Sequence, residues 1–309
     1  MAGKAVGTEP SASLPELPAA AGADLVDCGS VATSGKSVKW DDRVMMRNDG
    51  YLLDHRQADT GQHSDAFAAL FDPTTFRHME GFGLGSGWRC WEVGAGGASV
   101  VSWLAKKVGP TGKVIATGTD LSWAVPSVVR PPVGVLVHRV GVDQPPGEGF
   151  DLVHARLALV HAPDHERALL SMIKALRPGG RLLVEDADLA LQPLACLEEA
   201  DPEHQLANRL RQAARALLSA RGVDPAHGRR LPRLLRAAGL RGVQADAYFP
   251  VAAPACAALE TSTIQQLRAD LVTANLATDA EIDRHLANVA AGTMDIAAAP
   301  LISAWGRKP

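Results

Sequence analysis

The chain has 309 residues and a mass of 32.5 kDa, which suffices for one large domain or for one domain with a cap. A formal net charge of −3 and a pI near 6.4 give no electrostatic indication of binding to nucleic acid or anionic lipid. No apolar run approaches the roughly 20 residues that a membrane-spanning helix needs, and the N-terminus lacks the charged-then-apolar order of a secretory signal. We therefore expect a cytoplasmic protein without nucleic-acid or membrane partners.

The cysteines are spread along the chain with no CxxC or Cys/His spacing. This distribution predicts neither a zinc site nor a disulfide framework, so we expect a reduced protein without bound metal. The four residues are Cys28, Cys90, Cys196 and Cys256.

The N-terminal part divides into two segments of different composition. Residues 1–45 are rich in Ala, Gly, Ser and Pro and offer little apolar surface to offset the entropy of ordering. We expect a disordered arm there, which is compatible with a contact between two copies of the chain in a homodimer. Residues 46–85 are predicted to be helical, because apolar residues recur near helical spacing in "SDAFAALFDPTTFRHM". Pro73 predicts a break between two helices, the second of which begins near Thr74.

From Trp88 onward, short apolar segments alternate with amphipathic ones. Five segments are typical of strands: "RCWEVGAG", "KVIATGTD", "VGVLVHRVGVD", "FDLVHARLALV" and, after a tight turn at "RPGG", "RLLVEDAD". Two segments are typical of helices, "ASVVSWLAKKV" and "DHERALLSMIKAL", the second capped by Asp164. Such alternation predicts a parallel sheet covered on both faces, with ligands beyond the carboxyl ends of its strands.

After Asp188 the sequence is mostly helical, with strand-like "GVQADAYFPVA" and "APLISAWGRK" as the last two strands. We therefore predict an α/β fold with a Rossmann-like, doubly wound, mostly parallel seven-stranded sheet and helices on both faces. The main domain spans residues 86–309, and a helical cap is inserted at about residues 190–240.

The segment "CWEVGAGGASV" places an acid two residues before a glycine-rich turn. Gly94 and Gly96 fit the start of a dinucleotide-binding G-x-G-x-x-G motif, but Ser99 occupies the third glycine position. No lysine follows at the spacing of a P-loop. The remaining pattern is E-x-G-x-G, in which the Glu92 carboxylate would repel a pyrophosphate but could receive an ammonium group. This favours S-adenosylmethionine, which carries no phosphate.

The surrounding sequence resembles the class I S-adenosylmethionine-dependent methyltransferases, in particular the natural-product branch that acts on small molecules. The resemblance rests on "FDLVHARLALVHAPDHERALLSMIKALRPGGRLLVED", on "GRRLPRLLRAAGL" and on "GYLLDHRQ", and it covers roughly residues 50–309. It implies methyl transfer to a small, mostly apolar metabolite. It also implies that the helical segment 46–85 lies over the cofactor site.

The resemblance also assigns cofactor-binding positions. Gly94, Ala95 and Gly96 would let the backbone approach the methionine part and the ribose, and Glu92 would orient this turn or meet the amino group. The full set of positions is Tyr51, Glu92, Gly94, Ala95, Gly96, Ser99, Gly118, Thr119, Asp120, Arg139, Val140, Ala155 and Arg156. Two alternatives stay open: Arg156 as a surface ion-pair residue, and Tyr51 as a helix-packing residue.

Two positions depart from the family pattern. The acid that usually ends strand two and binds the ribose hydroxyls is replaced by Gly118, with Asp120 two residues later. The acid that usually follows strand three is replaced by Arg139, which cannot accept hydrogen bonds from an adenine amino group. These departures leave an alternative function open, a repurposed methyltransferase fold that catalyses a cyclisation, isomerisation or hydroxylation.

The candidate catalytic residues follow strands four and five. His161, in "LALVHAPD", is the candidate general base, and Asp186 is a candidate for binding a polar acceptor group. Glu185 and Asp188 share that acidic cluster, which is predicted to follow the fifth strand. A hydrogen bond of His161 to the following turn, and simple solvation of the acids, are the structural alternatives. His154 has no partner that spacing identifies.

Overall fold

The computed structural model describes residues 60–125 and 127–309; the arm predicted for residues 1–45 and Tyr51 lie outside the described residues. The helices are α2 (Thr60–Gly81), α3 (Ala98–Val108), α4 (His165–Ala175), α5 (Pro202–Ala220), α6 (His227–Ala237), α7 (Pro254–Thr273) and α8 (Asp279–Ala290), with a short 3-10 helix, η1 (Leu159–His161). The strands are β1 (Arg89–Val93), β2 (Lys113–Gly118), β3 (Val133–Val137), β4 (Phe150–Arg156), β5 (Leu176–Ala187), β6 (Arg241–Tyr248) and β7 (Leu301–Arg307).

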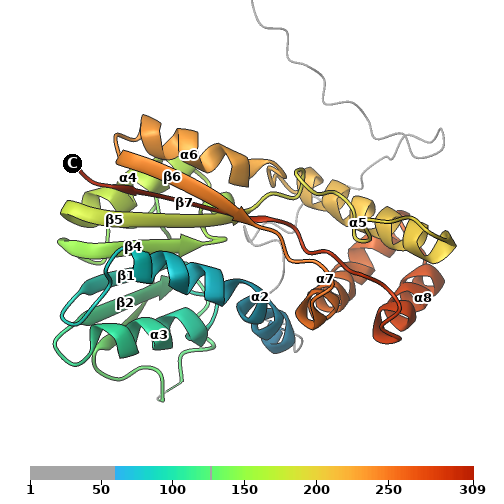
Figure 1. Ribbon diagram of the computed structural model, residues 1–309, viewed down its shortest axis with the longest axis horizontal. Helices are drawn as coiled ribbons and strands as arrows, with labels where there is room; N and C mark the ends of the chain where they lie inside the picture. The colour runs from blue at the N-terminus through green and yellow to red at the C-terminus, as the bar shows by residue number, and fades with distance from the viewer. Residues whose placement is uncertain (1–59, 126) are drawn as a thin grey trace, which may run out of the picture. The chain divides into compact units, whose positions relative to one another are not determined.

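The seven strands form one sheet in the order β3-β2-β1-β4-β5-β7-β6 (Figure 1). β7 runs antiparallel to β5 and β6, and the pairs among β1 to β5 are parallel. The predicted Rossmann-like fold with a mostly parallel seven-stranded sheet is confirmed. The strand order reverses between β1 and β4, which is where open α/β sheets bind ligands.

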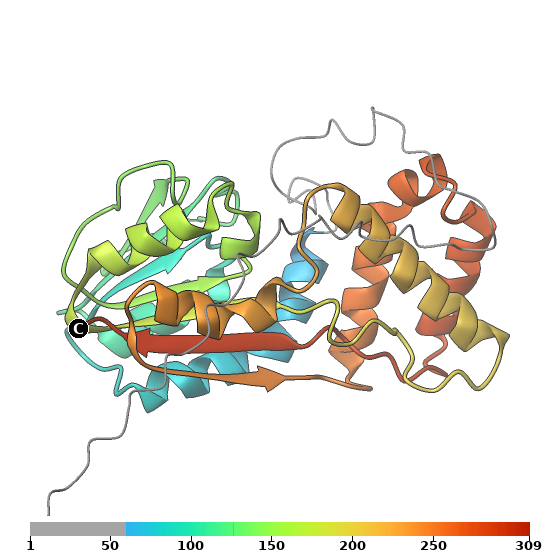
Figure 2. The same cartoon turned by 90° about the horizontal axis from the view of Figure 1, so that it is seen from above.

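Helices cover both faces of this sheet, as Figures 1 and 2 show. On one face, Trp91 and Val93 of β1 pack in a core with α4 and α6. On the other face, Cys90 packs with Val101 and Leu104 of α3 and with Met79 of α2. β1 can therefore bury nearly every side chain along its length, as central strands of parallel sheets do.

Helix α2 is longer than the sequence suggested. The break predicted at Pro73 is wrong, because α2 is a single helix of 22 residues that continues through this proline. A proline inside a helix removes one backbone hydrogen bond. Here Leu70, Phe71 and Met79 of the same helix are buried against α7, α3 and the sheet, and this packing offsets the lost bond.

The turn predicted at "RPGG" also differs from the structure. These residues lie inside β5, where the pairing with β4 shifts register between Phe150 and Leu152. Gly179 adopts a left-handed φ of 76° within this irregularity. The glycine thus permits a bulge in the strand rather than a turn before it.

The helical part beyond the sheet is built from two separate insertions. α5, between β5 and α6, packs with α7 and α8, which lie between β6 and β7, around an apolar core that includes Leu210, Leu267 and Ile282. α6, also inside the span 190–240, instead packs on β5, β6 and β7. The helical bundle α5/α7/α8 therefore draws on more of the chain than that span. None of the helices in the described part is long and apolar enough to cross a membrane.

Gly228 lets α6 approach the sheet closely. A methyl group at this position would lie 2.7 Å from the Asp186 carbonyl oxygen and 2.9 Å from Cγ1 of Ile302. We expect Gly228→Ala to lower the free energy of unfolding by about 1–3 kcal/mol, the usual effect of overpacking. The matched control is Gly81→Ala, at the end of α2, where a methyl group meets no atom within 4 Å. Equal urea midpoints for the two variants would contradict the tight packing of α6.

Candidate functional site

The glycine-rich turn after β1 is held tightly at the point where the strand order reverses. Gly94 has a left-handed φ of 68°, and a methyl group there would lie 2.5 Å from Cβ of Ala158. The Ala95 amide donates a hydrogen bond to the Thr117 carbonyl of β2, at 2.8 Å. Position 94 therefore requires a glycine for two reasons: the backbone is left-handed there, and Ala158, just after β4, leaves no space for a side chain.

The next two glycines have open space beside them. No atom lies within 4 Å of a methyl group placed on Gly96 or Gly97. Gly97 is the N-cap of α3 and provides no side-chain hydrogen bond to the helix, and Ser99 in the first turn is exposed. The first amides of α3 thus face a position that an oxygen-bearing ligand can approach.

The loop after β2 reaches back over this turn. The indole nitrogen of Trp123 donates to the Ala95 carbonyl at 2.7 Å. A side chain at Gly118 would begin 3.3 Å from that same carbonyl, so the missing acid could not be restored without a shift. Thr119 is exposed, whereas half-buried Asp120 accepts a hydrogen bond from the Ser122 amide at 2.8 Å. Asp120 is therefore the acid that the end of β2 offers, and its carboxylate can accept further bonds.

The loop after β3 lies beside the loop after β2. The His138 amide donates to the Gly118 carbonyl at 3.0 Å, and the His138 ring meets the edge of Trp91. Arg139 is exposed, and its amide donates to the Asp143 carboxylate at 2.7 Å. Val140 is half-buried and packs against the core under α4. This hydrogen bond therefore joins the two ends of the loop segment from Arg139 to Asp143.

At the end of β4, Ala155 is fully buried between β1 and β5, and Arg156 turns toward α2. The Arg156 guanidinium lies 2.8 Å from the Asp72 carboxylate, donates to the Thr75 hydroxyl at 3.1 Å and covers the Phe67 ring. Its side chain is 11% exposed. Arg156 thus forms an ion pair, but one that is largely shielded from solvent rather than on the surface, and it connects α2 to the end of β4.

Beneath the glycine turn, a buried polar chain crosses the sheet from strand to strand. Nδ1 of His154 lies 2.6 Å from Oε2 of Glu92, and Nε2 lies 3.2 Å from Oε2 of Glu185. His154 and Glu185 are fully buried and Glu92 is 4% exposed. Three neighbouring strands, β1, β4 and β5, therefore supply a carboxylate, an imidazole and a carboxylate in a row.

Other elements complete the coordination of Glu185. The hydroxyls of Thr75 in α2 and Ser303 in β7 donate to its two oxygens, at 2.5 and 2.7 Å. Nδ1 of His78 lies 3.5 Å from Oε1 of Glu185, and its Nε2 lies 3.0 Å from the Asp246 carboxylate of β6. Through Thr75 and His78, α2 is therefore bound to β5 and β6 by polar groups.

The pKa values of His154, Glu185 and His78 are set by the charged and hydrogen-bonding groups around them. Burial by itself lowers the pKa of His154, but the charge of Glu92 and the hydrogen bonds with Glu185 and Glu92 outweigh it and raise that pKa to about 9. Burial disfavours the charged form of Glu185, yet hydrogen bonds from His154 and His78 hold its pKa well below the usual range. The pKa of His78 is also raised, since Glu185 and Asp246 outweigh its burial.

The acidic cluster does not follow β5 as predicted, because Glu185 and Asp186 lie within the strand. Asp186 is fully buried on the face covered by α6, 3.5 Å from Nε2 of His227, and burial raises its pKa well above the usual range. Asp188 is also buried and pairs with Arg229, at 2.6 Å. These carboxyls are therefore partnered or neutral groups of the interior rather than solvated acids. His161 ends η1 and is half-buried, and its role as a base stays a prediction.

Sequence reasoning missed His154, Trp123 and the α2 residues that contact the sheet. The partner of His154 lies 62 residues away, so local spacing could not identify it. The available signal was the strand order, because neighbouring β1 and β4 in register place Glu92 beside His154.

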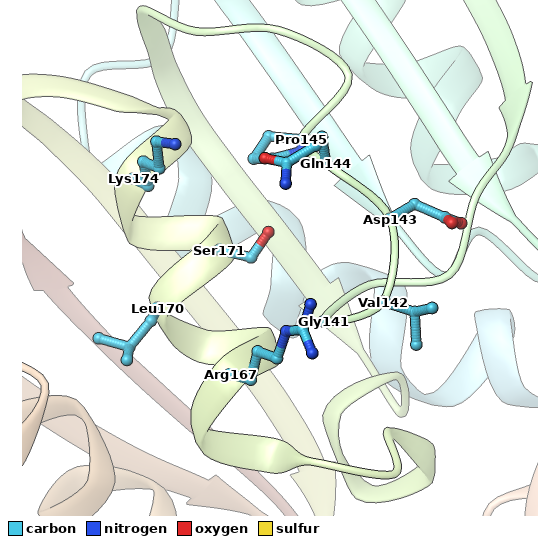
Figure 3. Close-up of a pocket in the computed structure, with 9 residues that line it drawn as sticks. All are labelled: Gly141, Val142, Asp143, Gln144, Pro145, Arg167, Leu170, Ser171 and Lys174. Carbon is cyan, nitrogen blue, oxygen red and sulfur yellow. The ribbon is translucent and has the colours of Figure 1, made fainter.

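A shallow groove of about 210 Å³ lies elsewhere, between the loop after β3 and the outer face of α4 (Figure 3). Its lining includes Asp143, Arg167, Ser171 and Lys174. It contains none of the predicted cofactor-binding positions, so we do not assign the site to it.

Comparison with known proteins identifies the family. A family model described as a methyltransferase domain matches residues 57–245, more than half of the chain. Methyltransferase str2 of Strobilurus tenacellus is 33% identical over 159 residues, 50% of this chain and 54% of that protein. Methyltransferase GfsG of Streptomyces halstedii is 30% identical over 131 residues, 40% of this chain and 46% of that protein. The chain thus matches about half the length of these curated relatives.

Solved structures show the same fold at low sequence identity. Phosphoethanolamine N-methyltransferase 2 of Haemonchus contortus has a TM-score of 0.51 and 15% identity, over 84% of this chain and 59% of that one. A putative methyltransferase of Anabaena variabilis has a TM-score of 0.50 and 16% identity, over 75% and 96% of the two chains. With the family match and the seven-stranded sheet, this chain belongs to the methyltransferase domain family.

Proposed function

We propose that this protein transfers a methyl group from S-adenosylmethionine to a small, mostly apolar metabolite. The observation that carries the proposal is the position of the turn from Gly94 to Gly97. It lies where the strand order reverses, beside the first amides of α3 and directly after buried Glu92, in a chain of the methyltransferase domain family. An acid at this place suits the ammonium of a methionine group better than a pyrophosphate.

The residues present fit this cofactor from one end to the other. Glu92 and the open space beside Gly96 suit the methionine end. Asp120 would accept hydrogen bonds from the ribose hydroxyls, in place of the acid that is missing at Gly118. At the adenine end, Val140 offers apolar contact, and the guanidinium of exposed Arg139 can stack on a base.

The acceptor class is inferred from the surroundings of the β4 end. Phe67, Leu157, Leu259 and Met294 are half-buried and pack against the apolar core between α2 and α7. The charge of Arg156 is already neutralised by Asp72, so Arg156 offers little to an acidic acceptor. Relatives named for C-methylation in ubiquinone and menaquinone biosynthesis, 30% identical over 116 residues, agree with a small acceptor.

Methyl transfer depends mainly on how the acceptor is positioned relative to the methyl group. S-adenosylmethionine, when bound, supplies an electrophilic methyl group, and the acceptor must lie in line with it. The chain would contribute by holding the methionine end on the turn after β1 and by enclosing the acceptor between α2 and the β4 end. A hydroxyl acceptor would in addition need a base, for which His161 is the candidate.

The proposed function predicts that the protein binds the cofactor. Calorimetric titration of the full chain with S-adenosylmethionine and with S-adenosylhomocysteine should give dissociation constants on the order of micromolar. Methyl transfer should then be detected as S-adenosylhomocysteine released in the presence of apolar acceptors. No binding at millimolar concentration would overturn the proposal and favour the repurposed fold that Gly118 and Arg139 suggest.

Gly96→Ala tests whether the ligand occupies the open space at the turn. The added methyl group meets no protein atom within 4 Å, so the melting temperature should stay unchanged. We expect the affinity for S-adenosylhomocysteine to fall about tenfold or more, because the methyl group would displace the ligand from the backbone. Gly81→Ala, equally open but remote at the end of α2, is the control and should bind as wild type does.

Asp120→Asn tests whether the Asp120 carboxylate binds the ribose hydroxyls. The amide can still accept the Ser122 bond, but the charge is lost, so we expect affinity to fall by about ten- to a hundredfold. Asp164→Asn is the matched control, since Asp164 likewise accepts a backbone bond as the N-cap of α4. Unchanged binding by the Asp120 variant would show that another group holds the ribose.

A further inference from the structure

The central member of the buried polar chain, His154, contacts a carboxylate at each ring nitrogen. Its Nδ1 lies 2.6 Å from Glu92 and its Nε2 lies 3.2 Å from Glu185. A neutral imidazole has one N–H, so one of its nitrogens would direct a lone pair at a carboxylate oxygen. The geometry is satisfied only when both nitrogens are protonated and donate.

We propose that His154 is a positioning residue for the methionine end of the cofactor site, where as a buried imidazolium it holds the Glu92 carboxylate in a fixed position beneath the glycine turn. The inference rests on the proposed function, because it assumes that this turn holds S-adenosylmethionine.

Glu92 depends on this contact because it is almost completely removed from water. A carboxylate that is removed from water needs hydrogen-bond donors or a positive charge in place of its lost hydration. His154 supplies the positive charge at one carboxylate oxygen, Oε2. With that oxygen fixed, the direction of the whole carboxylate group, two residues before Gly94, is fixed too.

His154 is itself held from the far side. Glu185 accepts bonds from Thr75 and Ser303 as well as from His154, so it cannot turn away. The other charged groups near Glu185 also have partners: Arg156 pairs with Asp72, and His78 contacts both Asp246 and Glu185. The charge of His154 is therefore shared by Glu92 and Glu185, from β1 and β5.

A purely structural role for His154 would affect all ligands of the site equally, whereas the proposed role affects only the amino-acid end. Two probes separate these cases. S-adenosylhomocysteine carries the amino-acid group, and 5′-methylthioadenosine shares its nucleoside but lacks that group. Each is titrated calorimetrically into wild type and into His154→Gln, which retains a donor but loses the charge.

We expect His154→Gln to bind S-adenosylhomocysteine about tenfold more weakly or worse, the range for a lost charge-assisted contact, and methylthioadenosine as wild type does. The control is His285→Gln, which removes another fully buried histidine that contacts a buried glutamate, Glu260, in the helical bundle. Equal losses for both probes, or no loss, would overturn the positioning role. A wild-type protein that binds neither probe would instead overturn the proposed function, and the inference with it.

A measurement on the wild type keeps the proposal testable if the variant does not fold. In ¹⁵N NMR spectra of the imidazole, both nitrogens of His154 should be protonated at neutral pH and should titrate only near pH 9. Glu92→Gln should lower that titration point, because it removes one of the two negative charges beside the ring. A neutral His154 ring at pH 7 would overturn the proposal.

Discussion

The contact of His154 with Glu92 and Glu185 is the interaction on which the rest of the site depends. Each of these groups alone would be costly in the interior of a sheet, and only their combination permits an acid directly beneath the glycine turn. The arrangement follows from strand register, since β1, β4 and β5 bring one member each to the same face. The central strands of this methyltransferase-family sheet therefore carry charge where most such strands carry only apolar side chains.

The same polar chain determines how α2 sits on the sheet. Thr75, His78 and Asp72 of α2 contact Glu185 and Arg156, so the helix is fixed by directional bonds as well as by apolar packing. Hydrogen bonds define one orientation, whereas apolar surfaces permit sliding. α2 therefore joins the ends of β4 and β5 to α7 of the helical bundle.

A second buried histidine–glutamate contact lies within the helical bundle. Glu260 of α7 contacts His285 of α8 and pairs with Arg211 of α5. Burial would raise the pKa of Glu260, but the Arg211 charge and the His285 hydrogen bond lower it to about 2. This polar cluster links the three helices of two separate insertions, which explains how α5 and the later pair α7 and α8 form one unit.

The sequence by itself determined the sheet, the helices beside it and the glycine turn, because apolar periodicity and glycine conformation are properties of neighbouring residues. The tertiary structure decided the partners of His154, the burial of Asp186 and the docking of α2, because these depend on contacts between residues that lie 31 to 168 positions apart. It also decided that α2 passes through Pro73, since packing outweighed a local preference. Local signals predict the elements, whereas the charges of a buried site are set by register between distant strands.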